Sequence, residues 1–148
     1  KFFVARNARV AQISADRVVI LDTTSNDGIT VTTTTTSFDN LVAGVTIDAI
    51  PGVTSDATAA ANLTGGNWGR VKVYGRHASV SLDGGAVTCG AGSRIYSHST
   101  AGVATVVPAA LNLSYDRLGT GVSGDSFGIA LEACAAGNTT LDVFIQKG

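Results

Sequence analysis

A serine in a glycine-flanked turn is the segment of this sequence that comes nearest to a reactive site. Ser126 lies in the string Gly-Asp-Ser-Phe-Gly. Such a hydroxyl becomes a nucleophile when a histidine accepts its proton and a carboxylate orients that histidine. His77 and His98 are the two histidines of the chain, and Asp83 or Asp116 is available as the orienting carboxylate. Together these residue types would perform acyl transfer through Ser126.

A structural interpretation of the same segment is nevertheless favoured. The string resembles the Gly-Asp-Ser-Gly-Gly of chymotrypsin-like serine proteases, but Phe127 stands in place of the first glycine after the serine. Those proteases place their site between two β-barrels, which normally need more chain than 148 residues. We therefore predict a turn that leads into a strand, and no catalytic residue. A small serine protease acting through Ser126 is kept as a distant alternative.

Metal, cofactor, nucleic-acid and membrane sites are not predicted. Neither histidine has a second histidine or a carboxylate at ligand spacing nearby. The glycines at 84–85 and 90–92 precede strand-like residues, whereas a phosphate-binding loop leads into a helix. The net charge is −1 and the ten basic residues are scattered, so no basic stripe is available for a phosphate backbone. No apolar run approaches the roughly 18 residues that cross a bilayer.

The composition predicts an all-β fold. Val and Thr are abundant, Glu132 is the only Glu and Met is absent, so residues that favour helices are scarce. Charged residues make up only 14% of the chain, against about 25% in typical soluble domains. A surface of Thr, Ser, Asn and Gly suits a protein that packs against neighbours. We expect a small β-barrel or sandwich-like core of short antiparallel strands with an extended N-terminal segment.

Strand-like runs separated by turn residues recur along the whole chain. A change in composition near Gly65 divides it into an N-terminal β segment or arm (1–65), with a Thr-rich strand and an Ala-rich loop, and a β-core domain (66–148). The Ala-rich residues 54–62 predict either one short helix or a loop. The expected strands are residues 2–5, 17–21, 29–36, 45–50, 70–74, 79–82, 86–88, 94–96, 104–107, 127–133 and 140–146.

One strand sequence occurs twice. Residues 44–50 match residues 128–134 position by position, with identical Gly and Ala, conservative Val/Ile and Ile/Leu pairs, and Asp48 matched by Glu132. Each copy is followed by a second strand, at 71–74 and at 141–144. The pattern indicates one hairpin design used twice, with chance similarity of seven strand residues as the alternative.

Two further features carry expectations about contacts. Cys89 and Cys134 both lie in apolar strand-like contexts, which favours buried free thiols over a disulfide.

The threonine tract, residues 30–36, has neither charge nor proline to block pairing. It is therefore either an ordinary solvent-facing strand or an edge that pairs with another chain. Carbohydrate recognition is a third interpretation of the tract. The candidate contact residues are Thr30, Thr32, Thr33, Thr34, Thr35 and Thr36.

Several strings in the second half resemble the decoration (cement) proteins of tailed-phage capsids. They are residues 69–75, 82–90, 128–133 with 136–137, and 141–145. The resemblance implies a non-enzymatic β protein that binds the major capsid protein on the outer surface of the expanded head, as a homo-oligomer and preferentially a trimer. It carries over no catalytic residue. The alternative is a head-fibre module or a receptor- or glycan-binding module.

Overall fold

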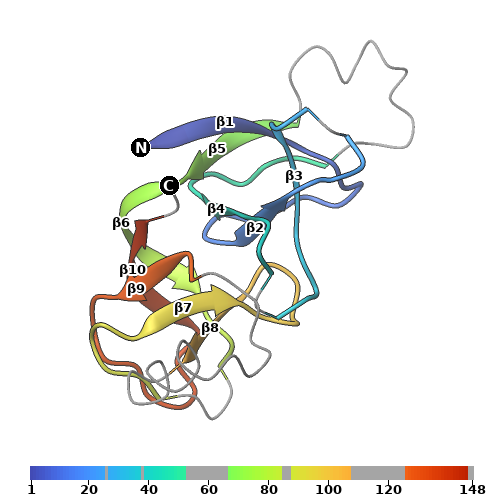
Figure 1. Cartoon of the computed structure of the whole chain (residues 1–148). Helices are drawn as coiled ribbons and strands as arrows, with labels where there is room; N and C mark the ends of the chain where they lie inside the picture. The colour runs from blue at the N-terminus through green and yellow to red at the C-terminus, as the bar shows by residue number, and fades with distance from the viewer. Residues whose placement is uncertain (26, 38, 53–66, 85–87, 108–125, 147–148) are drawn as a thin grey trace.

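The computed structural model describes residues 1–25, 27–37, 39–52, 67–84, 88–107 and 126–146. These residues form ten β-strands and no helix, which confirms the all-β prediction. Figure 1 shows the strands in two groups, one built from the blue-to-green first half of the chain and one from the green-to-red second half.

The first group is a closed five-stranded barrel with the order β1-β3-β2-β4-β5. β1 pairs with β3 in parallel and with β5 in antiparallel fashion, and these two pairings close the barrel. Its strands are β1 (Phe2–Asn7), β2 (Val18–Leu21), β3 (Thr30–Thr32), β4 (Val42–Thr46) and β5 (Trp68–Lys72).

The second group is a five-stranded sheet with the order β6-β10-β9-β7-β8. A single parallel bridge between Leu82 and Ala104 connects its two ends, so the sheet curls into the same circular order as the barrel. Its strands are β6 (Tyr74–Ser81), β7 (Arg94–Ser97), β8 (Ala104–Val107), β9 (Gly128–Ala130) and β10 (Thr140–Gln146).

The two groups repeat each other in register, which confirms the duplicated hairpin. Val45 of β4 lies opposite Lys72 of β5, and its counterpart Ile129 of β9 lies opposite Phe144 of β10. Lys72 of β5 is therefore equivalent to Phe144 of β10. The sequence had matched Lys72 with Asp142, so the second strands of the repeat align two residues further along β10 than predicted.

The repeat extends to an unusual backbone position before β2 and β7. Asp16 has a positive φ of 63° and donates its N–H to Thr46. Gly92 has a φ of 87° and donates its N–H to Ala130 in the same way. Asp is one of the few residues with a side chain that tolerates this conformation, so either residue type can fill the position.

The repeat also accounts for the two cysteines. An isolated antiparallel bridge joins Ile13 to Ile50 in the first half, and the equivalent bridge joins Cys89 to Cys134 in the second. The two cysteines form a disulfide across that bridge, with their Cα atoms 4.8 Å apart, so the expectation of free thiols was wrong. Both cysteines occupy apolar positions, as the sequence indicated. Their contact could not be predicted locally, because the fold brings together two residues 45 apart in the chain.

The glycine that opens each copy of the repeat is required by close backbone contact. A Cβ on Gly44 would overlap the carbonyl oxygen of Lys72, and one on Gly128 would lie 2.8 Å from the carbonyl oxygen of Phe144. Neither position can accept a side chain without movement of the neighbouring strand.

A shared apolar core joins the two groups. Val18, Val42 and Val45 of the barrel belong to the same buried cluster as the interior residues of the second sheet, such as Phe127 and Ile145. A separate cluster that includes Val19 and Val71 fills the barrel itself. Strands β2 and β4 are thus buried on both faces, and each fully buried Val contributes roughly 1.5–3 kcal/mol.

Several expected strands differ from those observed. Residues 29–36 form a strand only at Thr30–Thr32, the expected strand 45–50 begins earlier and ends at Thr46, and 127–133 is reduced to Gly128–Ala130. The expected strand 140–146 is observed with the same bounds. β5 pairs with β1 and β4, so the sheets divide at Val73 and not near residue 65. The Ala-rich segment 54–62 and residues 86–87 lie outside the described part.

Candidate functional site

The catalytic-looking residues lie in three different places. His77, buried in β6, has its Nε2 atom 2.7 Å from an Asp16 carboxylate oxygen. His98, in the turn after β7, has its Nε2 atom 3.3 Å from an Asp83 carboxylate oxygen. Ser126 precedes β9 and, among the described residues, forms no hydrogen bond with either histidine.

These placements do not assemble the expected acyl-transfer set within the described part of the chain. Asp83 does lie beside a histidine, as the sequence allowed, whereas Asp116 falls outside the described residues. The described residues form one closed five-stranded barrel and a second five-stranded sheet, and not the two closed barrels between which such proteases place their site.

The threonine tract runs from inside the barrel to its surface. Thr30 is buried, and its hydroxyl donates to Asp27 Oδ2 at 2.6 Å while accepting a hydrogen bond from Arg6. Hydrogen bonds from the Thr30 hydroxyl and from the N–H groups of Ile29 and Thr30 lower the pKa of Asp27 to about 2. β3 lies between β1 and β2: Thr30 pairs with Arg6 of β1, Thr32 pairs with Ile20 of β2, and Val31 pairs with both strands.

The rest of the tract, residues 33–36, leaves the sheet and crosses toward β7. The buried Thr34 hydroxyl donates to Asp39 at 2.7 Å, and the Ser97 hydroxyl donates to the carbonyl of Thr36 at 3.1 Å. Thr35 and Thr36 are exposed. A single chain does not test contact with another molecule, so the intermolecular role of this tract stays a prediction.

A ribbon of exposed aromatic, aliphatic and basic side chains covers the outer face of β1 and β5 and reaches the start of β6. We call it the aromatic ribbon, and it consists of Phe2, Val4, Trp68, Arg70 and Tyr74. Phe2 is 56% exposed and Trp68, the only Trp of the chain, is 38% exposed. The Arg70 guanidinium lies 5.8 Å from the centre of the Phe2 ring, within the range of a cation–π interaction.

The aromatic ribbon is held in place by its neighbours. Arg70 donates two hydrogen bonds of 2.7 Å to the carboxylate of Asp48, and these bonds lower the pKa of Asp48. Tyr74 packs edge-on against Phe144 of β10, with ring centres 5.2 Å apart, so the aromatic surface continues onto the second sheet. Sequence analysis missed this surface, although alternate exposed aromatic and basic residues in two adjacent strands are its signal.

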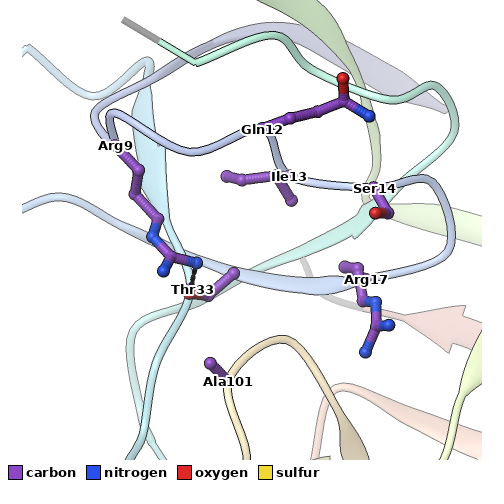
Figure 2. Close-up of a pocket in the computed structure, with 7 residues that line it drawn as sticks. All are labelled: Arg9, Gln12, Ile13, Ser14, Arg17, Thr33 and Ala101. Carbon is purple, nitrogen blue, oxygen red and sulfur yellow. Dashed lines mark hydrogen bonds between the residues drawn. The ribbon is translucent and has the colours of Figure 1, made fainter. Parts of the chain in front are cut away.

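A small hollow lies where the barrel meets the turn between β7 and β8 (Figure 2). It has a volume of about 210 Å³. Figure 2 shows Arg9 and Arg17 on opposite sides of it, with Thr33 and Ala101 between them. Arg9 donates to the Thr33 hydroxyl at 2.6 Å. The remaining lining residues are Gln12, Ile13 and Ser14.

Two other kinds of site were sought in the described residues. In them, no group of three or more His, Cys, Asp or Glu side chains is placed to hold a metal ion. The described part also contains no helix long and apolar enough to cross a membrane.

Comparison with known proteins shows a likeness of fold. No protein-family profile and no curated protein sequence matches the chain. Among solved structures, it superimposes on the N base of the head fibre protein gp8.5 of bacteriophage phi29 with a TM-score of 0.53. The chain therefore shares its overall fold with that N base. The likeness covers 100% of this chain and 95% of the phi29 chain, at 13% sequence identity.

Proposed function

We propose that this chain is a non-enzymatic structural protein of a phage virion that binds the outside of the head. The observation that carries the proposal is the fold shared, over the whole chain, with the base of a phage head fibre. The partner would be the major capsid protein. The sequence resemblance to decoration proteins leads to the same location by an independent route.

The composition and surface of the molecule support such a role. Its aromatic ribbon presents Phe, Trp, Tyr and Arg, the residue types enriched at the centres of protein interfaces. Its sparse charge, 14% of residues, suits a surface that is covered by neighbours. We propose the aromatic ribbon as the face that lies on the capsid, where Lys1 and Lys72 beside it favour an apolar capsid surface with acidic residues at its margin.

Attachment would be multivalent. The capsid lattice repeats the same site many times, which favours a symmetric oligomer, and we propose a trimer. Linked contacts within one oligomer raise the overall affinity without any new chemistry. Sedimentation of the free protein measures this directly, and a monomer at all concentrations would contradict the trimer.

Binding to heads tests the proposal itself. Purified chain is mixed with expanded heads that lack it, and the complex is examined by electron cryomicroscopy. We expect one ordered density at each equivalent lattice site, together with a blue shift of the fluorescence of Trp68, the only Trp. Absence of ordered density at saturating protein would refute the role.

A pair of variants tests the docking face. Phe2→Ser combined with Trp68→Ser removes two apolar contacts from the aromatic ribbon and should abolish stoichiometric binding. Leu131→Ser removes a side chain of similar exposure that lies outside the aromatic ribbon, and it should bind normally. Equal loss of binding in both variants would contradict this choice of face.

The decoration protein and the head-fibre base are two forms of the same attachment. The fold likeness favours a fibre base, and the sequence resemblance favours a decoration protein. Images of the intact virion distinguish them. A fibre that projects from each bound copy indicates a base, and a low cap without a projection indicates a decoration protein.

A further inference from the structure

Arg9 and Arg17 both line the hollow, and neither has a carboxylate partner among the described residues. Three other arginines are paired with carboxylates, Arg6 with Asp27, Arg70 with Asp48 and Arg76 with Asp142. Two unpaired positive charges on either side of one hollow repel each other and attract an anion. A guanidinium matches the two oxygens of a carboxylate in a planar, bidentate arrangement.

Arg9 is positioned from the barrel interior. The fully buried Asn7 accepts a hydrogen bond from the Arg9 N–H at 2.8 Å and donates through Nδ2 to the carbonyls of Ala11, Ile50 and Pro51. These bonds fix the loop after β1 that carries Arg9. The hydrogen bond from the Arg9 side chain to Thr33 then fixes one face of the guanidinium, which leaves its other N–H groups for a ligand.

The backbone of Arg17 is held by Thr46. Its N–H donates to the hydroxyl of the buried Thr46 at 2.9 Å, and its carbonyl accepts the N–H of Thr46 at 2.9 Å. The turn between β7 and β8 closes one wall, because a Cβ on Gly102 would lie 3.2 Å from Arg17 Cβ and 3.3 Å from Thr33 Cγ2. The site is thus made by both halves of the molecule.

The duplicated half shows that the fold does not need these residues. The same backbone pairing in the second sheet is made with Leu82 in place of Asn7, Ser93 in place of Arg17 and Ala130 in place of Thr46. The loop equivalent to that of Arg9, residues 83–88, contains no basic residue, and its one charged residue is Asp83. Two arginines and the two polar residues that hold them therefore occur only where the hollow is.

We propose that this hollow binds a carboxylate group between Arg9 and Arg17. The Thr33 and Ser14 hydroxyls and the Gln12 amide supply further polar groups around it. The carboxylate belongs either to a small organic acid or to an acidic side chain on another protein. The shared chemistry is the same in both cases, and the proposal does not depend on the capsid role.

Nuclear magnetic resonance titration of the whole chain tests the site. The probes are malonate and an end-capped peptide with one central Asp, in buffer at about 0.15 M salt so that long-range attraction is screened. We expect saturable shifts at the Thr33 and Ala101 amides and at the Arg9 and Arg17 Nε–H groups. If neither probe gives saturable shifts there in the millimolar range, the site is refuted.

Variants test which side chains bind the probe. Arg9→Gln and Arg17→Gln should each weaken binding by about tenfold or more, the usual loss for one charged hydrogen-bonding partner. Arg76→Gln, which removes an arginine already paired with Asp142 and outside the aromatic ribbon, should leave binding unchanged. Equal weakening in all three variants would show general attraction by positive charge and would refute a specific site.

The two probes distinguish the sources of the carboxylate. An Asp peptide that binds at least about tenfold more tightly than malonate indicates an acidic side chain of a partner protein, since only the peptide offers backbone contacts around the hollow. Malonate that binds as tightly as the peptide indicates a small organic acid. The same peptide with Asn in place of Asp should not bind, and its binding would refute recognition of the charge.

Discussion

Four glycines of this molecule differ in backbone φ and in the space around a missing Cβ, so replacing each by Ala shows how a methyl group changes stability there. Gly90 has an ordinary φ and open space around its missing Cβ. Gly137 also has open space but a φ of +93°. Gly128 has an ordinary φ but would clash with Phe144 and Val143, and Gly44 combines a φ of +154° with a clash against Lys72. Substitution of each by Ala therefore separates conformational strain from steric overlap.

The structure sets the expected size of each effect. Gly90→Ala should change the free energy of unfolding by less than about 0.5 kcal/mol, as at most surface positions. Gly137→Ala should cost about 1–3 kcal/mol from the unfavourable φ. Gly128→Ala should cost about 1–3 kcal/mol from overpacking. Gly44→Ala should cost about 2–6 kcal/mol because it carries both penalties.

Urea denaturation followed by circular dichroism measures the four values. For an unfolding slope of about 2 kcal/mol per molar urea, Gly44→Ala should lower the midpoint by about 1–3 M. Gly90→Ala is the control for loss of a glycine as such. If Gly44→Ala is no less stable than Gly137→Ala, the close approach of β4 to the Lys72 carbonyl is not as described, and the reasoning fails.

Two further predictions concern covalent and electrostatic stabilisation. Cys89→Ser combined with Cys134→Ser should lower the free energy of unfolding by about 2–4 kcal/mol, because the disulfide closes a 45-residue separation in the unfolded chain. Thermal unfolding with and without reductant measures this loss. A double variant as stable as the oxidised protein would contradict the prediction. Asp27 has its pKa lowered to about 2 in the folded state, so its contribution is fully present above its usual pKa of 3.8 and is lost as the pH falls toward 2. Asp27→Asn should therefore show a shallower loss of stability over that pH interval than the parent chain, and parallel curves would contradict the Thr30 contact.

The sequence predicted much of the local structure because its strand signals are local. Alternation and β-branched residues placed strands at 94–96, 104–107 and 140–146, where the structure has them. The seven-residue repeat at 44–50 and 128–134 was recognisable because both copies meet the same demand, a glycine facing a neighbouring carbonyl. Signals of this kind need no knowledge of distant residues.

The features that were missed depend on contacts across the fold. The pairing of Asp16 with His77 joins residues 61 positions apart, and the disulfide joins residues 45 apart, so neither has a local signal. The sequence predicted one long strand through the threonine tract, because every residue in the tract favours strands. Its actual end at Thr32 is set by side-chain bonds of the following residues, such as that of Thr34 with Asp39.

The candidate site also depends on contacts between residues that are far apart in the sequence. Arg9 and Arg17 are unremarkable in the sequence, eight positions apart in a stretch without a motif. The hydrogen bonds of Asn7 and Thr46 to the two backbones, together with the β7–β8 turn, place Arg9 and Arg17 beside one hollow. The comparison between the two halves then separates what the fold requires from what one half has added.

Tyr74 gives the path of the backbone an unusual property. The Lys1 amino group donates to the Tyr74 carbonyl at 2.7 Å, and Gln146 lies opposite Tyr74 in the β6–β10 pair. The backbone thus begins beside Tyr74, passes through Tyr74 when it leaves the barrel, and reaches the end of β10 beside the same residue. A chain that ran through residues 74–146 first and 1–72 second would keep every strand pair, so the two halves are topologically interchangeable. Residues 1 and 146 thus both lie beside Tyr74, which belongs to the aromatic ribbon.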